Sequence, residues 1–136
     1  MQETLTKKVS LAETKKNIEA YFVTHDVQYV AEDAVFTHLN TGERTVGREA
    51  VRQMLHYIYH VAFDAKAEVI NTVITEDHAL LEANIVGKHI GEFAGIPATN
   101  KQVNFPVCVC YDLENGLVKN ARVYIVMDVL MKQLNS

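Results

Sequence analysis

The pair Asn115-Gly116 is the sequence feature that most restricts the fold of this chain. It lies between two runs rich in Val, aromatic and other strand-forming residues, residues 103–112 and 117–127. An Asn-Gly pair between two such runs is the strongest short-range signal for a β-hairpin, because both residues tolerate the positive φ angles of a tight turn. The sequence therefore predicts two long antiparallel strands near the C-terminus.

Helical signals lie before and after this hairpin. Ser10 and Glu13 form a capping-box pattern, which predicts a helix that runs to about residue 24. Gly47 opens a second predicted helix, whose apolar residues fall on one face at helical spacing. Its apolar stripe consists of Val51, Met54, Leu55, Ile58, Val61 and Ala62. Asp128 is predicted to cap a short final helix.

The remaining segments favour strands and a long loop. Alternating patterns predict strands at residues 34–39, 65–75 and 79–90. Residues 25–33 are compatible with either a turn of helix or extended chain. Residues 91–100 contain two Gly and one Pro and are predicted to form a loop, where functional groups tend to gather. Together these elements predict an α+β fold with helices packed on a curved antiparallel sheet.

Length and charge restrict the class of protein. With 136 residues, the chain is predicted to form one domain over residues 10–136, preceded by a flexible segment, residues 1–9. The formal net charge is -4, and no Lys/Arg cluster alternates with aromatic residues, which argues against nucleic-acid binding. No apolar run approaches the ~20 residues of a membrane span, and the first residues lack the apolar core of a signal peptide. A cytoplasmic location is therefore predicted.

No metal or disulfide site is predicted. Cys108 and Cys110 are two apart in a predicted strand, so they point to one face and are poorly placed to bond each other. We interpret them as small buried hydrophobic residues. His56 and His60 are four apart on the second predicted helix, a spacing that can bind a metal, but they lack the acidic partner of the metalloprotease motif.

Several segments, taken in order, resemble the SnoaL-like proteins, the polyketide cyclase branch of the nuclear transport factor 2-like superfamily. After the first predicted helix, these segments are AEDAVF, a TG turn, VGREAV, G-x-H-x-GEFAGIPATNK, DLENGLV, R-x-Y and L-M-K-Q-L. With that helix, the resemblance covers residues 11–134, approximately. The resemblance implies a cone, in which a strongly curved antiparallel sheet wraps around helices and encloses a mostly apolar pocket. It also implies intramolecular aldol ring closure without metal or organic cofactor, and pairing as a homodimer.

One position departs from the family pattern. The family ending has the form Y-x-D before its Gln-Leu pair. Aligned backward from Gln133-Leu134, Tyr124 matches the tyrosine, but Val126 stands where the acid is expected. Asp128 follows two residues later and is the candidate for a displaced acid.

The last predicted strand supplies candidate site residues. By the family pattern, Arg122, Tyr124 and Val126 face the pocket, while Val123 and Ile125 belong to an apolar face suited to a dimer interface. Arg122 has two interpretations, which are binding of an enolate oxygen and an ion pair with Glu82. Tyr124 is a candidate hydrogen-bond donor to a carbonyl.

Histidines complete the candidate set. His38 and His89 each lie in a predicted strand near a glycine-containing turn or loop, where the cone should open, and imidazole suits proton transfer near neutral pH. Each candidate also has a structural interpretation, and for Asp128 this is the helix cap. The predicted pocket wall consists of Tyr21, Met54, Tyr57, Phe93, Phe105 and Val126.

Three functional hypotheses follow. The first is a cofactor-free enzyme, such as a cyclase or isomerase, that acts on a small apolar carbonyl compound. The second is a binding protein for a similar ligand, without catalysis. The third is an association domain without a pocket.

Overall fold

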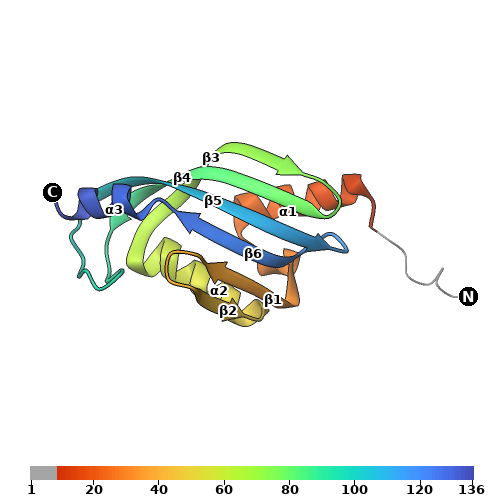
Figure 1. Cartoon of the computed structure of the whole chain (residues 1–136), viewed down its shortest axis with the longest axis horizontal. Coiled ribbons are helices and arrows are strands. Elements are labelled where there is room, and N and C mark those ends of the chain that lie inside the picture. The colour runs from red at the N-terminus through yellow and green to blue at the C-terminus, as the bar shows by residue number, and fades with distance from the viewer. Residues whose placement is uncertain (1–8) are drawn as a thin grey trace, which may run out of the picture.

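The computed structural model describes residues 9–136. The predicted flexible segment, residues 1–9, therefore lies outside the described residues except for Val9. The elements, shown in Figure 1, are α1 (Leu11–Thr24), the 3-10 turn η2 (Val27–Tyr29), β1 (Val30–His38), β2 (Glu43–Val46), α2 (Arg48–His56), the π-helical turn η3 (Tyr57–Ala62), β3 (Phe63–Ile74), β4 (His78–His89), β5 (Gln102–Glu114), β6 (Leu117–Ile125) and α3 (Met127–Leu134).

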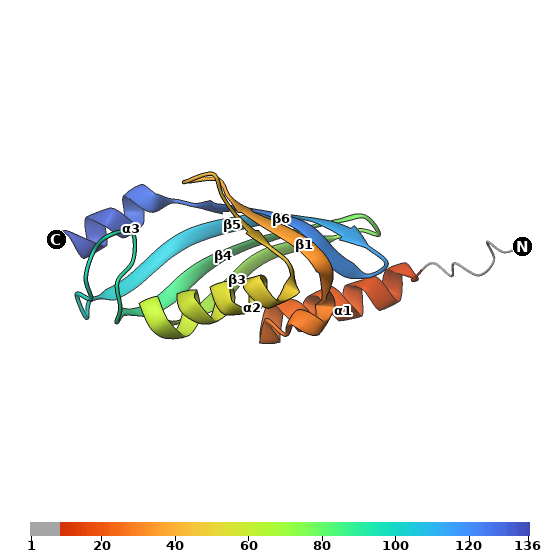
Figure 2. The ribbon, with the colours of Figure 1, turned by 90° about the horizontal axis from the view of Figure 1, so that it is seen from below.

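The described strands form one six-stranded sheet in the order β2-β1-β6-β5-β4-β3. All neighbours are antiparallel except β1 and β6, which run parallel, so the sheet is mixed and not wholly antiparallel as predicted. Figure 2 shows that α1 and α2 lie along one face of the curved sheet, whereas α3 lies beyond its end. This arrangement is an α+β fold with an inner sheet face covered by helices.

The hairpin prediction is confirmed. Asn115 and Gly116 connect β5 and β6 and both have positive φ angles, 52° and 75°. Two successive residues with positive φ are the mark of a tight turn whose twist matches that of the strands. The sequence did not predict β2, because its four residues, ERTV, are mainly polar and exposed and show no apolar alternation.

Two helix starts have different outcomes. Ser10 caps α1 as predicted, since its hydroxyl accepts a hydrogen bond from the Glu13 N–H at 3.1 Å. The prediction that Asp128 caps the last helix is wrong, because α3 starts one residue earlier and Asp128 lies exposed in its first turn. The carbonyl of Val126, at the end of the sheet, accepts from the Val129 N–H and so takes the capping position.

Alternation along β5 divides the sheet into two faces. Val103, Phe105, Val107, Val109, Tyr111 and Leu113 are buried toward the helices. Cys108 and Cys110 point the other way and are only half-buried, so the prediction that they are core residues is wrong. They share one face as predicted, but strand alternation places that face on the outside of the sheet. Among residues 9–136, no helix has both the length and the apolar character needed to cross a membrane.

Candidate functional site: an aromatic cavity with tyrosine and histidine groups

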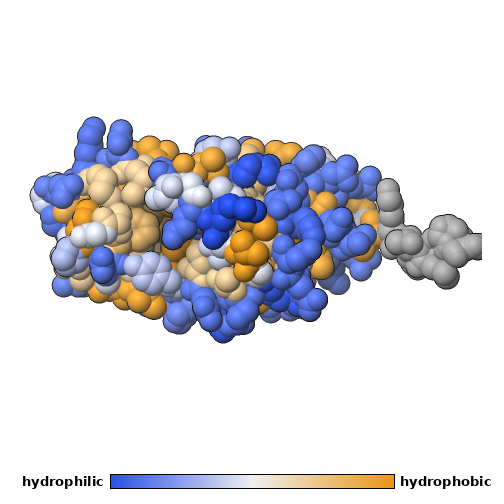
Figure 3. Space-filling model, turned by 60° about the horizontal axis from the view of Figure 1, so that its bottom comes forward, coloured by the Kyte–Doolittle hydropathy of each residue, from blue (hydrophilic) through white to orange (hydrophobic). Residues whose placement is uncertain are grey.

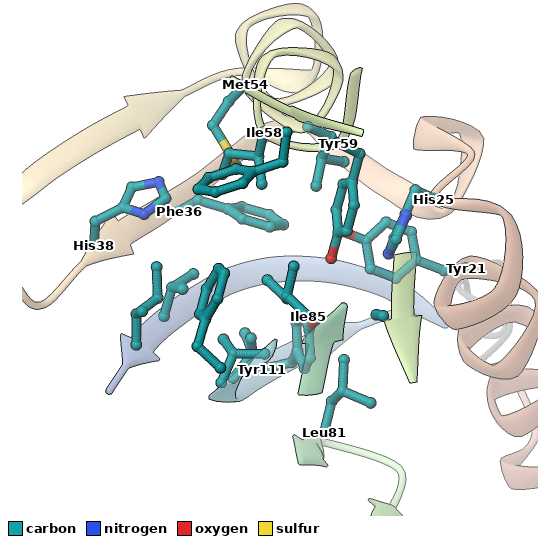
Figure 4. Close-up of a pocket in the computed structure, with 18 of the residues that line it drawn as sticks. Tyr21, His25, Phe36, His38, Met54, Ile58, Tyr59, Leu81, Ile85 and Tyr111 are labelled. Carbon is teal, nitrogen blue, oxygen red and sulfur yellow. The ribbon is translucent and has the colours of Figure 1, made fainter. Parts of the chain in front are cut away.

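A cavity lies between the inner sheet face and the helices (Figure 4). We call it the inner cavity; its volume is about 60 Å³. Its wall is dominated by Phe, Tyr and aliphatic side chains from α1, β1, α2, η3 and β3 to β6. The polar side chains that line it are Tyr21, His25, His38, Tyr59 and Tyr111. Among the described residues, no Asp, Glu, Lys or Arg lines this cavity.

The inner cavity adjoins a wider space, which we call the mouth, with a volume of about 540 Å³. The two spaces share five lining residues, His38, Met54, Ile58, Phe93 and Ile125. The mouth is more polar, since Glu43 and Gln53 also line it. Figure 3 shows apolar residues gathered toward the end of the molecule that holds α3, with hydrophilic residues dominating the opposite end. A ligand can therefore present an apolar body inward and keep polar groups near the mouth.

Three tyrosines from different elements meet around the inner cavity. Tyr21 belongs to α1, Tyr59 to η3 and Tyr111 to β5, and we call them the tyrosine cluster. The rings of Tyr21 and Tyr111 lie edge to face, with centroids 6.2 Å apart. None of the three hydroxyls donates to another residue in the part of the chain that the structure describes. Buried phenols normally have a hydrogen-bond partner. Because these three donate to no protein group among residues 9–136, a ligand in the cavity can accept their hydrogen bonds.

Burial keeps the tyrosine cluster protonated. It raises the pKa of Tyr59 to about 12 and raises the pKa of Tyr21 further. Burial also raises the pKa of Tyr111 well above its usual value, with smaller contributions from neighbouring tyrosines and cysteines. Because an ionised phenol is disfavoured in an apolar site, all three groups are hydrogen-bond donors at neutral pH.

His38 lines both spaces, at the end of β1 where the inner cavity meets the mouth. It is paired in register with Val123 of the parallel strand β6. Burial lowers the pKa of His38, and the nearby Glu43 carboxylate opposes this effect. The imidazole is therefore mainly neutral near pH 7 and able to accept a proton.

His89 lies in a different place from His38. Its side chain is fully buried and does not line the inner cavity. Its Nδ1 accepts the Thr99 N–H at 3.2 Å and lies 2.9 Å from the Thr99 hydroxyl oxygen, which ties β4 to the end of the loop at residues 91–100. The Phe63 ring, which does line the cavity, packs against the His89 ring at 5.3 Å between centroids. His89 therefore has structural contacts through Nδ1 only, because its buried Nε2 has no hydrogen-bond partner among the described residues.

The predicted orientation of β6 is wrong. Arg122 and Tyr124 point to the outer face. The Arg122 side chain is 39% exposed, and Tyr124 as a whole residue is 45% exposed. Val123 and Ile125 instead line the inner cavity. The apolar side chains of β6 point inward because helices cover the inner face of the sheet. A shift of one residue along a strand moves every side chain to the opposite face, so the predicted and observed inner sets are exchanged.

The consequences extend to three predicted residues. Arg122 binds neither a cavity ligand nor Glu82; its guanidinium donates to Asp112 at 3.0 Å and 3.2 Å. This contact holds the pKa of the Asp112 carboxyl below its usual value. Val126 is 46% exposed and lines neither space, and Asp128 is exposed in α3 and lines neither space. The face predicted to form a dimer is the cavity face.

The predicted pocket wall is otherwise found around the two spaces. Tyr21, Met54, Phe93 and Phe105 line the inner cavity. Tyr57 lines the mouth, where its hydroxyl donates to the carbonyl of Glu92 in the loop.

Sequence reasoning missed His25, Tyr59 and Tyr111 as cavity residues. Tyr59 lies four residues after Leu55, so helical spacing contained a signal for it. Tyr111 is six residues after Phe105 on the same strand, so alternation places both on one face and also predicts Tyr111 as a cavity residue. His25 directly follows the predicted end of the first helix, near residue 24, but its place in the cavity wall depends on how α1 packs against η3. Local pattern contains no signal for that packing.

The curved mixed sheet and its covering helices have the α+β architecture of the nuclear transport factor 2-like fold. The family model described as SnoaL-like polyketide cyclase matches residues 20–134, and the chain belongs to this family.

Solved structures agree on the fold. A protein from Jannaschia sp. CCS1, assigned to the SnoaL-like polyketide cyclases, has a TM-score of 0.81 at 14% identity and covers 96% of this chain and 98% of its own. AclR from Streptomyces galilaeus, assigned as a hydroxylase, has a TM-score of 0.72 at 22% identity, and the match covers 93% of this chain and 98% of AclR. A phenazine biosynthesis-related protein from Pseudomonas aeruginosa has a TM-score of 0.75 at 16% identity, with 91% and 82% covered. No curated protein matches the sequence.

Proposed function

We propose that the protein is a small-molecule enzyme of the cyclase or isomerase type, which transfers a proton on an apolar substrate that carries a carbonyl group. The observation that supports this most directly is the placement of His38 and the tyrosine cluster in one mainly apolar cavity. Family membership supports the same type of role. In this proposal the tyrosine hydroxyls bind the substrate oxygen, and His38 moves the proton.

The chemistry follows from the state of each group. Neutral His38 accepts a proton from the carbon next to the carbonyl, and the electron pair left on that carbon is delocalised onto the oxygen. Hydrogen bonds from the tyrosine cluster stabilise the enolate oxygen, and they are strong because the aromatic wall excludes water. In a cyclase the enolate carbon then attacks a second carbonyl, a C–C bond forms, and the new alkoxide takes the proton back from His38; in an isomerase, His38 returns the proton at another position. Only a proton and an electron pair move, so the step needs no oxidant or reductant.

A general probe can test this proposal without knowledge of the natural substrate. 5-Nitrobenzisoxazole is small, flat and apolar; a base removes its ring C–H proton, the N–O bond breaks and a coloured nitrophenolate forms. We expect wild-type protein to accelerate this reaction and His38→Ala to lose about a hundredfold or more of the rate, as for removal of a general base. His78→Ala is the matched control, because His78, the first residue of β4, is exposed on the outer face of the sheet.

Equal rates for His38→Ala and wild type would contradict the role of His38. A second candidate function is binding without catalysis, and one observation favours it. The cavity-facing positions near the end of β6 are Val123 and Ile125, so this strand presents no carboxylate to the inner cavity. Saturable binding of the probe in calorimetry, with no turnover by wild type or any variant, would support a binding protein.

The expected homodimer stays a proposal. Since Val123 and Ile125 face the cavity, its interface would have to lie elsewhere, and the outer sheet face with Cys108, Cys110 and Tyr124 is the alternative. Sedimentation of wild type and of Tyr124→Glu would test it, with a smaller sedimentation coefficient expected for the variant. An unchanged coefficient would exclude this face.

A further inference from the structure

His25 lies in the wall between two spaces. On one side is the inner cavity, and on the other is a groove of about 210 Å³ at the surface, which we call the outer groove. His25, Leu55 and Tyr59 line both. The outer groove is otherwise lined by Thr24, Arg52, His56 and His60. A side chain in this position can contact a cavity ligand from one side and water from the other.

The His25 ring is held in place by aromatic contacts. It stacks on Tyr59, with centroids 4.6 Å apart and an interplanar angle of 21°, and meets Tyr21 edge to face at 5.8 Å (Figure 4). The backbone at His25 is left-handed, with φ 56°, and its N–H donates to the Tyr21 carbonyl at 2.7 Å. This conformation ends α1 and places the ring between two members of the tyrosine cluster.

The ring is chemically ready to exchange a proton. Neither ring nitrogen is engaged in a hydrogen bond with another residue of the described chain, so both are available. Burial lowers the pKa of His25, and the neighbouring His60 lowers it further. The groups around it are Tyr21 from α1, Tyr59 and His60 from η3, and Arg52 and His56 from α2, of which Arg52 is neutralised by Glu49. Within residues 9–136, no carboxylate lines either space at this end, so His25 is mainly neutral at pH 7.

We propose that His25 is a second proton-transfer residue of this site, which takes a proton from an acidic hydroxyl bound at the tyrosine cluster and passes it to water in the outer groove. The inference rests on the proposed function, because it assumes that the tyrosine cluster binds the ligand oxygen. The proton leaves the ligand O–H for a ring nitrogen of His25, and the oxyanion keeps the electron pair and accepts hydrogen bonds from the tyrosine hydroxyls. The ligand class is a small aromatic or enolic compound whose hydroxyl is acidic.

4-Nitrophenol is a suitable probe, because it is a small aromatic hydroxyl compound and only its anion absorbs strongly in the visible range. At a pH where the free probe is mostly un-ionised, we expect the probe bound to wild-type protein to show the absorbance of the anion. When the probe is bound to His25→Asn, its anion absorbance should be no greater than that of the free probe at the same pH. Asn is chosen because it tolerates the left-handed backbone and cannot accept a proton at this pH.

Controls separate the possible outcomes. His78→Asn should keep the anion absorbance, because His78 is exposed on the outer face of the sheet. Calorimetry with 4-nitrophenol in buffers of different ionisation enthalpy should show that wild type releases a proton to solvent on binding, and that His25→Asn binds the probe without this release. A bound but un-ionised probe in wild type, or an ionised probe in His25→Asn, would overturn the inference and leave the His38 proposal standing. Absence of binding by wild type would overturn both.

Discussion

The two faces of β5 and β6 differ in burial and polarity, although neighbouring residues of the same strands supply them in alternation. On the inner face, Phe105, Tyr111 and Val123 are buried and enclose the cavity. On the outer face, Cys108 is half-buried and Arg122 is paired with Asp112 at the surface. The difference shows that strand alternation is easily recognised, whereas the choice of the inner face is made by the elements that cover it.

This choice also decides which residues can do chemistry. The family ending led to a prediction that Arg122, Tyr124 and Val126 face the pocket. Helices α1 and α2 cover the opposite set, so the polar cavity groups come from three tyrosines and two histidines on other elements. An alignment that is displaced by one residue on a strand therefore transfers the wrong side chains.

The largest expected effect is loss of a large side chain from the inner face. Phe105 is 1% exposed and packs against Phe63 at 5.7 Å between ring centroids. Phe105→Ala should lower the free energy of unfolding by about 3–5 kcal/mol, because it removes apolar contact and leaves a cavity. Chemical denaturation measures this. The neighbouring outer-face control, Asn104→Ala, should stay within about 0.5 kcal/mol. Similar losses for both would contradict the assignment of the faces.

The next effect is a pH dependence of stability that arises at the cavity. Folding lowers the pKa of His25 and of His38, so the unfolded chain binds more protons as the pH falls through about 6.5. The free energy of unfolding should therefore decrease as the pH falls below this value, and the stabilisation is complete above it. Denaturant titrations on both sides of this pH measure the decrease.

Substitution of the two histidines tests whether they cause this pH dependence of stability. The double variant His25→Asn/His38→Asn should show a smaller decrease than wild type between the same two pH values. His78→Asn should show the wild-type decrease, because His78 is 69% exposed. A decrease that persists unchanged in the double variant would show that other groups cause it.

A carboxylate placed on β6 tests the parity directly. Ile125 and His38 line both the inner cavity and the mouth, so Ile125→Asp should raise the pKa of His38 through a nearby negative charge. Val126→Asp, one residue later, should leave the pKa of His38 close to its wild-type value because Val126 lines neither space. NMR titration of the imidazole measures both. A larger shift in Val126→Asp would restore the orientation predicted from the family ending.

The smallest effect is on cysteine reactivity at the outer face. Cys108 and Cys110 are half-buried, and burial raises the pKa of the Cys108 thiol. Both should react with a disulfide reagent in the folded protein, with Cys108 reacting slowly at neutral pH and faster as the pH rises. Mass spectrometry of single-cysteine variants, Cys108→Ala and Cys110→Ala, measures each rate. Reaction only after unfolding would place the thiols in the core or under another chain.

Much of the fold was predictable because its signals are local. Ser10 and Glu13 define the start of α1 through one hydrogen bond three residues apart, and Asn115-Gly116 define the hairpin through backbone preference. The candidate site was less predictable. His38 was identified from its place near a turn, whereas His25, which caps the end of α1, was not singled out as a candidate.

By itself, the sequence determined the order of the long strands and helices, the turn that joins β5 to β6 and the family resemblance. Tertiary structure decided which face of β6 turns inward, that β1 and β6 run parallel, and that Tyr21, Tyr59 and Tyr111 meet in one cavity. The reason is physical. Turns and caps depend on φ angles and hydrogen bonds within a few residues, whereas facing and convergence depend on burial against elements far away in the chain.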